Sequence, residues 1–185
     1  MGSQHADEFI NLLQTIESQN PPNSWKKVAT VGIGGLTDVG YADNSDLLLV
    51  VSTQGRGVFD CITGKRLARI RENELDEDEW YYWRKLKALG IGPLEGQMIS
   101  IAGLFGGGLL QATEDNWELE AIQTHWPDTS VVLIQPHQTF FWEEPSGWTK
   151  IFEEQVCEFR TYGFSETGCS FVIATSCQLH IFSRE

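Results

Sequence analysis

Residues 40–60 read GYADNSDLLLVVSTQGRGVFD, and residues 163–183 read GFSETGCSFVIATSCQLHIFS, which repeats the same pattern without a gap. Set 123 positions apart, the two stretches carry glycine, aromatic, acidic, branched and hydroxyl residues in the same order. The matched pairs are Gly40 and Gly163, Tyr41 and Phe164, Asp43 and Glu166, Val50 and Ile173, Ser52 and Thr175, and Phe59 and Phe182. Internal similarity at a fixed offset is typical of stacked or radially repeated folds. The repeat therefore indicates an architecture of that kind.

Short β-type runs separated by turn residues extend through the first copy and its flanks. These runs are residues 25–33, 37–41, 47–52, 57–60 and 66–70. The turn signals between them are Gly34-Gly35, Asp43-Asn44-Ser45, Gln54-Gly55 and Thr63-Gly64. Similar runs return at 98–102, 109–113, 117–122 and 131–134. Short, evenly spaced strands of this kind predict an all-β sandwich, barrel or propeller.

The first copy with its continuation, residues 35–70, resembles one blade of a WD40-type β-propeller. The shared features are two polar turns, a buried strand, a glycine turn and an aromatic-Asp pair. They are Tyr41-Ala42-Asp43, residues 48–51, Gly55, Phe59-Asp60 and Thr63-Gly64-Lys65. Residues 157–183 repeat the scheme, and a looser copy lies within 127–142. The resemblance implies antiparallel blades, although the Gly-His and Trp-Asp dipeptides of the family are missing.

The length of the chain limits how many such blades it can hold. Its 185 residues leave room for about four blades of roughly 40 residues once the helical segments are subtracted. We therefore expect a mainly β chain, an antiparallel propeller-like or sandwich-like meander with an N-terminal helix and one inserted helix. The length also favours a single domain, residues 1–185. Its expected parts are the helix at 6–18, the β repeat at 24–70, a charged helical insertion at 71–90 and a β region at 97–185.

Helical periodicity marks the two segments that lie outside the β pattern. Residues 6–18 place four apolar side chains on one face, and the pair Pro21-Pro22 ends the segment. The insertion at 71–90 has its acids in the first half and its bases in the second. This order complements a helix dipole, and Gly90 is a suitable residue to end the helix.

Charge and cysteine content exclude several classes of function. A net charge of −13 repels phosphate backbones and anionic membrane surfaces, so we expect neither nucleic acid nor membrane as a partner. The same charge attracts a basic protein. The start of the chain has no signal-peptide pattern, and no apolar run approaches the roughly 20 residues of a membrane helix. The four cysteines lack C-x-x-C and zinc-ligand spacing, and Cys61, Cys169 and Cys177 fit small core residues. Four separate thiols without an export signal predict a cytoplasmic protein.

No catalytic constellation stands out from the sequence. The four histidines form no H-x-H or H-E-x-x-H pattern, and there is no G-x-S-x-G elbow. The glycines at 32–35 and 106–108 lack the Lys-Ser/Thr of a phosphate loop, so turns explain them better. We therefore expect a protein that is not an enzyme, with no catalytic residue, no cofactor and no bound metal.

The charged insertion contains the candidate partner-binding residues. Acids stand beside aromatic side chains there, which resembles the composition of interface hot spots. The candidates are Asp76, Glu77, Asp78, Glu79, Trp80, Tyr81 and Trp83. The alternative interpretation is a solvated helix face. A second group of aromatic residues at 140–148 is either core or a further part of the same surface.

Three functional hypotheses follow, and the sequence names neither a partner nor an oligomeric state. The leading one is a non-enzymatic protein-binding module, in its most concrete form a bacterial immunity protein that binds and neutralises a basic toxin such as a nuclease. Electrostatic steering would speed such a complex. The second is a structural scaffold of β repeats that assembles with itself. The third is a carbohydrate-binding or hydrolase domain with a cleft lined by Trp117, Trp126 and Trp142.

Overall fold

A computed structural model describes residues 10–22, 24–71, 80–123, 128–138 and 147–184. Strands make up 53% of the chain and form four antiparallel sheets, and the one short helix covers residues 10–15 of the described part. The prediction of a mainly β fold is therefore confirmed. The predicted N-terminal helix is confirmed over residues 10–15. No helix in the described ranges is long and apolar enough to cross a membrane.

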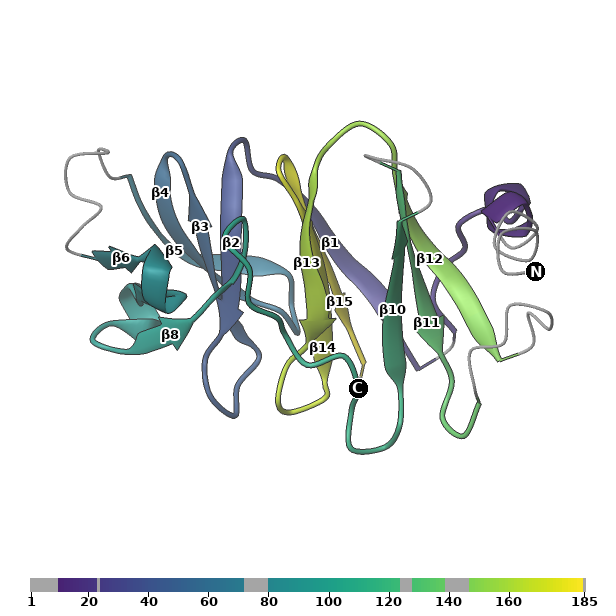
Figure 1. The fold of residues 1–185 in the computed structure, drawn as a ribbon. Helices are drawn as coiled ribbons and strands as arrows, with labels where there is room; N and C mark the ends of the chain where they lie inside the picture. Colours follow the sequence, from purple (N-terminus) through teal and green to yellow (C-terminus); the bar gives the residue numbers. More distant parts are fainter. Residues whose placement is uncertain (1–9, 23, 72–79, 124–127, 139–146, 185) are drawn as a thin grey trace.

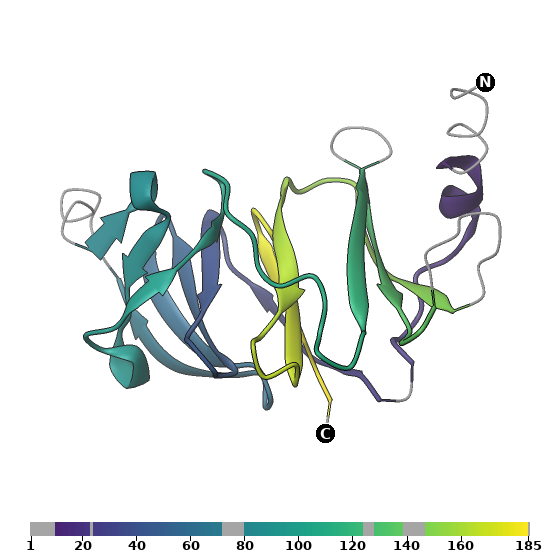
Figure 2. The same cartoon turned by 60° about the horizontal axis from the view of Figure 1, so that its bottom comes forward.

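The four sheets lie one after another in a row (Figure 1, and turned by 60° in Figure 2). The first sheet holds β6 (Tyr81–Tyr82), β7 (Lys87–Leu89) and β8 (Met98–Ser100). The second holds, in spatial order, β5 (Lys65–Ile70), β4 (Gly55–Asp60), β3 (Leu47–Ser52), β2 (Leu36–Tyr41) and β9 (Ala102–Gly103). The third holds β1 (Lys26–Gly32), β15 (Gln178–Ser183), β14 (Ser170–Thr175) and β13 (Phe159–Phe164). The fourth holds β10 (Glu118–Gln123), β11 (Thr129–Ile134) and β12 (Trp148–Glu154).

The sequence repeat coincides with a structural repeat. Strands β2, β3 and β4 of the second sheet begin and end 123 residues before β13, β14 and β15 of the third. The outer strand of each sheet corresponds as well: β5 pairs with β4 in the second sheet, and β1 pairs with β15 in the third. The second and third sheets are thus two copies of the same four-stranded unit, placed next to each other in the row. The described residues do not close into a ring, since the first and fourth sheets stand at opposite ends of the row.

The third sheet joins the two ends of the described chain. Its strand β1 comes from the N-terminal region and pairs antiparallel with β15, from Lys26 opposite Ser183 to Gly32 opposite Gln178. An irregularity between Lys27 and Ala29 shifts the register by one residue. Because β1 is far in sequence from the other three strands, this sheet depends on a long-range contact.

Central strands of the row are buried on both faces, which explains their unbroken apolar runs. In β3, Leu48 and Val50 pack toward the third sheet, while Leu49 and Val51 pack toward the first. In β14, side chains alternate in the same way between the second and the fourth sheets. At the far end, Leu13 of the helical segment covers the outer face of the fourth sheet. Alternating residues of single strands therefore build successive core layers.

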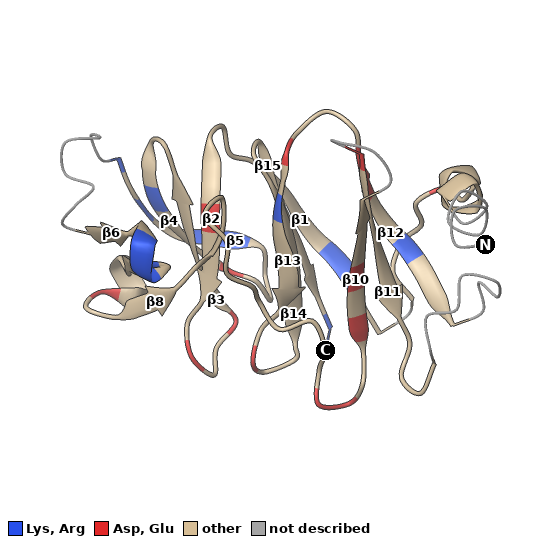
Figure 3. Cartoon of the chain, viewed as in Figure 1, with Lys and Arg blue, Asp and Glu red and all other residues tan. Residues whose placement is uncertain are grey.

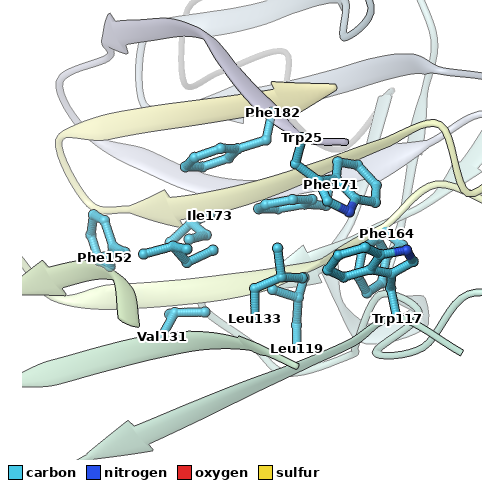
Figure 4. Close-up of a cluster of buried hydrophobic side chains, with 11 residues drawn as sticks. Trp25, Trp117, Leu119, Val131, Leu133, Phe152, Phe164, Phe171, Ile173 and Phe182 are labelled. Atoms are coloured by element: carbon cyan, nitrogen blue, oxygen red, sulfur yellow. The ribbon is translucent and has the colours of Figure 1, made fainter. Parts of the chain in front are cut away.

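The layer between the third and fourth sheets is rich in aromatic rings (Figure 4). Trp25 lies at one end of this layer, with ring centroids 4.9 Å from Phe171 and 6.0 Å from Trp117. Trp117 is therefore a core residue and does not line an open cleft. Trp126 and Trp142, the other members of the expected tryptophan cleft, lie outside the described residues.

The inserted helix expected over 71–90 is wrong for residues 81–90, although Trp80 itself has helical backbone. After Trp80 the chain forms β6, a 3-10 turn η2 (Trp83–Lys85) and β7. Trp80, Tyr81 and Ala88 are buried against the second sheet, and β7 pairs with β8. Tertiary pairing and burial here override the helical spacing of the apolar residues. Residues 72–79 lie outside the described part of the chain.

The expectation of four separate thiols is also wrong. Cys157 and Cys177 form a disulfide that joins the β12–β13 connection to the β14–β15 turn. Cys177 is thus a bridge residue and not a small core residue. Cys61 is buried, as expected, and its burial raises the pKa of its thiol far above the ordinary value. The cytoplasmic location stays a prediction.

Candidate partner-binding surface

One end of the row carries a cluster of exposed apolar side chains. Trp83, Leu104 and Phe105, here called the aromatic patch, are 42%, 46% and 50% exposed. The rings of Trp83 and Phe105 lie 5.0 Å apart and are tilted by 36°. Exposed apolar groups that lie next to one another cost free energy in water and commonly mark a binding surface.

The 3-10 turn η2 holds Trp83 at the surface. It ends at Leu86, whose left-handed backbone (φ 51°) lets its N–H donate to the carbonyl of Trp83. The carbonyl of Leu86 in turn accepts from the N–H of Ile101, which anchors the turn to the chain beyond β8. The guanidinium of Arg84 lies 5.0 Å from the centre of the Trp83 ring. Trp83 therefore projects from a turn that is tied through Leu86 to the chain beyond β8.

A tight glycine turn positions the other two members of the aromatic patch. Gly103 and Gly106 exchange backbone hydrogen bonds of 2.9 and 3.1 Å, and the N–H of Leu104 donates to the carbonyl of Thr37. A Cβ at Gly103 would lie 2.1 Å from that carbonyl oxygen, so the close approach needs glycine. Leu104 and Phe105 are thus held at the tip of a turn that is fastened to β2.

Buried polar contacts support the patch from below. Tyr81 is 8% exposed, its ring lies 6.5 Å from Phe105, and its hydroxyl donates to Oδ2 of the fully buried Asp38 at 2.6 Å. Arg56 stacks on Trp80 with its guanidinium 4.4 Å from the ring centre, and it donates to the carbonyl of Leu89. These contacts hold in place the buried side chains that support Trp83 and Phe105.

A hollow that is open to solvent, with about 260 Å³ of room for water-sized molecules, lies between the aromatic patch and the second sheet. Its walls combine the aromatic rings with hydroxyl groups of the second sheet. The lining residues are Thr37, Val51, Ser52, Thr53, Tyr81, Trp83, Leu104 and Phe105. Such a mixture can accommodate an apolar side chain of a partner and a few of its polar groups.

The candidate partner-binding residues proposed from the sequence fall into three groups: exposed, buried, and outside the described part of the chain. Trp83 is exposed, whereas Trp80 and Tyr81 belong to the core and serve the surface only by supporting it. Asp76, Glu77, Asp78 and Glu79 lie outside the described residues. Leu104 and Phe105 were missed by the sequence reasoning. The sequence signal that could have found them is an apolar pair between two glycines, Gly103 and Gly106.

A second cluster, at the connection between β12 and β13, groups possible metal ligands. Glu154, Cys157 and Cys177 place their ligand atoms within 4.8 Å of one another. The two sulfurs are bonded to each other, and Oε1 of Glu154 accepts the backbone N–H groups of residues 155–157 at 2.8 to 3.0 Å. Burial alone would raise the pKa of Glu154, but these bonds lower it. The cluster therefore fits a structural closure of the β12–β13 connection.

The buried histidine His180 lies beside this cluster. Its burial, reinforced by the charge of Lys27 and opposed by that of Glu154, lowers its pKa to about 4. Its ring lies 4.8 Å from that of Phe152, and Nδ1 is 3.3 Å from Oγ1 of Thr30. His180 is thus a neutral packing residue at physiological pH.

Comparisons with protein-family models, with curated proteins and with solved structures gave no match to this chain. The fold and the surface therefore define its class by themselves. It is a stack of antiparallel β sheets with an internal repeat and an exposed aromatic patch at one end.

Proposed function

We propose that this chain is a non-enzymatic protein-binding module and that the aromatic patch is the centre of its contact surface. The observation that carries the proposal is the exposure of Trp83, Leu104 and Phe105 on backbone that hydrogen bonds tie to the sheets. Aromatic anchors supply much of the binding energy in protein interfaces. Anchors that are already ordered lose little conformational entropy on binding.

The most concrete form of this function is immunity to a basic toxin such as a nuclease. A nuclease needs a basic cleft for its phosphate-bearing substrate, and a chain with net charge −13 is complementary to such a cleft. Acids at 76–79 directly precede β6 and η2 in the sequence. Further acidic residues occupy the loops along one edge of the row (Figure 3). These charges support steering of a basic partner toward the surface.

Affinity capture with matched baits tests this proposal. The tagged wild-type chain, the variant Trp83→Ala/Phe105→Ala and the control Ile62→Ala/Val156→Ala are exposed to host lysate at low and high salt. Ile62 and Val156 are also exposed apolar residues, 39% and 85%, so their removal controls for general stickiness. We expect one basic protein on wild type and control. Its affinity for the aromatic variant, measured with the purified protein, should fall at least about tenfold.

Retention of the same protein by all three baits with equal affinity would contradict the role of the aromatic patch. A further arm reverses charge at Asp76, Glu77, Asp78 and Glu79. We expect slower association and a flatter salt dependence from this variant. An unchanged affinity at low salt would remove that segment from the mechanism.

Self-assembly is the competing function, because Leu67 and Ile70 are exposed on the edge strand β5. Basic residues, Lys65, Arg66 and Arg69, interrupt this strand, and interspersed charges discourage edge-to-edge pairing. Light scattering over a hundredfold concentration range separates the two functions. A mass that rises with concentration in the absence of a partner would favour the scaffold.

A further inference from the structure

The layer between the second and third sheets contains a space that side chains leave empty. It is a narrow crevice open to solvent, and the room in it for water-sized molecules is about 30 Å³. Its lining includes Gly32 and Ile33 at the end of β1, Gly55 and Gly57 of β4, and Arg66 and Arg69 of β5. Val50 and Ser52 of β3 and Arg56 and Phe59 of β4 complete the described lining, so three of its ten residues are glycines.

The internal repeat shows what fills the corresponding space elsewhere. The position equivalent to Gly57, 123 residues later, is His180. That imidazole is buried and packs on Phe152 of the fourth sheet. A Cβ at Gly57 would find its nearest neighbours at 3.6 Å, an ordinary contact distance. Neither crowding nor a turn therefore requires glycine at 57, and its effect is to leave the crevice open.

Three arginines line the crevice. Arg56 stacks on Trp80 and donates to the carbonyl of Leu89, whereas Arg66 and Arg69 have no such partner within the described part of the chain. Arg66 pairs with Phe59 and Arg69 with Gly57 in the β4–β5 ladder, so both arginines lie on the side of the crevice. Both are exposed, and within the described part of the chain no ion pair or side-chain hydrogen bond engages either guanidinium. None of the described residues that line the crevice is acidic. Figure 3 shows basic residues on β4 and β5 in this part of the molecule.

We propose that this crevice binds the oxyanion group of a small ligand, a phosphate or a carboxylate, through Arg66 and Arg69. The planar guanidinium matches such groups with paired N–H donors, and two together recognise one anion strongly. Glycines at 55 and 57 let the anion approach the backbone closely. The overall charge of −13 does not oppose this locally, because exposed charges are screened beyond about 8 Å at physiological ionic strength. The proposal is independent of the function assigned to the aromatic patch.

Nuclear magnetic resonance of the ¹⁵N-labelled full chain tests the site directly. Inorganic phosphate, acetate and chloride are titrated separately at constant ionic strength. We expect saturable shifts of the amides of Gly32, Gly55 and Gly57 with phosphate or acetate and none with chloride. The stronger of the two ligands tells whether the natural group is a phosphate or a carboxylate. Absence of saturable shifts with both would overturn the proposal.

Three variants distinguish anion binding in the crevice from a nonspecific effect of positive charge on the strand. The variant Arg66→Gln/Arg69→Gln should bind at least about tenfold more weakly, because hydrogen bonds to charged groups contribute strongly. The control Lys65→Gln/Arg71→Gln removes the same charge from the same strand and its end, outside the crevice lining, and should bind like wild type. Gly57→His fills the crevice as His180 fills its counterpart and should also abolish binding. Equal loss in the control, or wild-type binding by Arg66→Gln/Arg69→Gln, would refute the site.

Discussion

Asp46 connects the second and third sheets through hydroxyl groups. Its Oδ1 accepts from Oγ of Ser165 at 2.7 Å and from Oγ of Ser170 at 2.6 Å, and its Oδ2 accepts from Oγ1 of Thr167 at 2.8 Å. We predict that Asp46→Ala lowers the free energy of unfolding by about 1 to 3 kcal/mol, because partly buried donors lose their acceptor. Urea denaturation measures the change. Asp43→Ala, an exposed acid of the same turn, is the control, and an equal effect from it would contradict the assignment.

The buried imidazole of His180 predicts a pH dependence of stability. Its pKa is about 4 in the folded chain and 6.5 as the ordinary value, so the unfolded state binds more protons between these limits. The free energy of unfolding should therefore fall as pH is lowered from about 6.5 to 4, by at most about 3 kcal/mol from this group. Urea curves at several pH values should show a flatter profile for His180→Gln than for wild type. His137→Gln, at an exposed histidine, should leave the profile unchanged, and identical profiles for all three would refute the prediction.

At the level of elements, the disulfide between Cys157 and Cys177 closes a loop that contains β13 and β14. The two cysteines are 20 residues apart, and the chain-entropy model gives about 3 kcal/mol for a loop of that size. We predict that Cys157→Ser/Cys177→Ser loses stability of this order, and that dithiothreitol reproduces the loss in wild type. Cys61→Ala/Cys169→Ala retains the bridge and should remain sensitive to dithiothreitol. A reductant effect of equal size on the variant without the bridge would contradict the prediction.

Elements differ in how well local sequence predicts them. Strands β3 and β14 were predictable, because runs of Leu, Val, Ile and Phe between turn residues need no distant information to favour extended backbone. The segment 81–89 was not, because its apolar spacing fits a helix and only the pairing of β7 with β8 makes strands of it. Only one part of the aromatic patch, Trp83, could be predicted from the sequence. Trp83 stood out among charged residues, whereas Phe105 acquires its exposure from a turn whose anchor, Thr37, is distant in sequence.

At the level of the whole molecule, the internal repeat explains the stack of sheets and also the one position discussed above, Gly57, where the two copies differ. Two units with the same strand pattern stand one layer apart, so alternate residues of one strand face different neighbours. Where the units carry different residues, His180 against Gly57, the layer is filled in one place and open in the other. Comparison of the two copies therefore identifies the crevice beside Gly57 as a candidate binding site.

The sequence by itself determined the β class, the repeat unit and the strands of its two copies. These features depend on side-chain alternation and turn residues, which act over a few neighbouring positions. The tertiary structure alone decided the order of the sheets, the pairing of β1 with β15, the disulfide and the exposure of the aromatic patch. Each of these joins residues far apart in the chain. Their contacts arise only when apolar faces of separate sheets meet and exclude water.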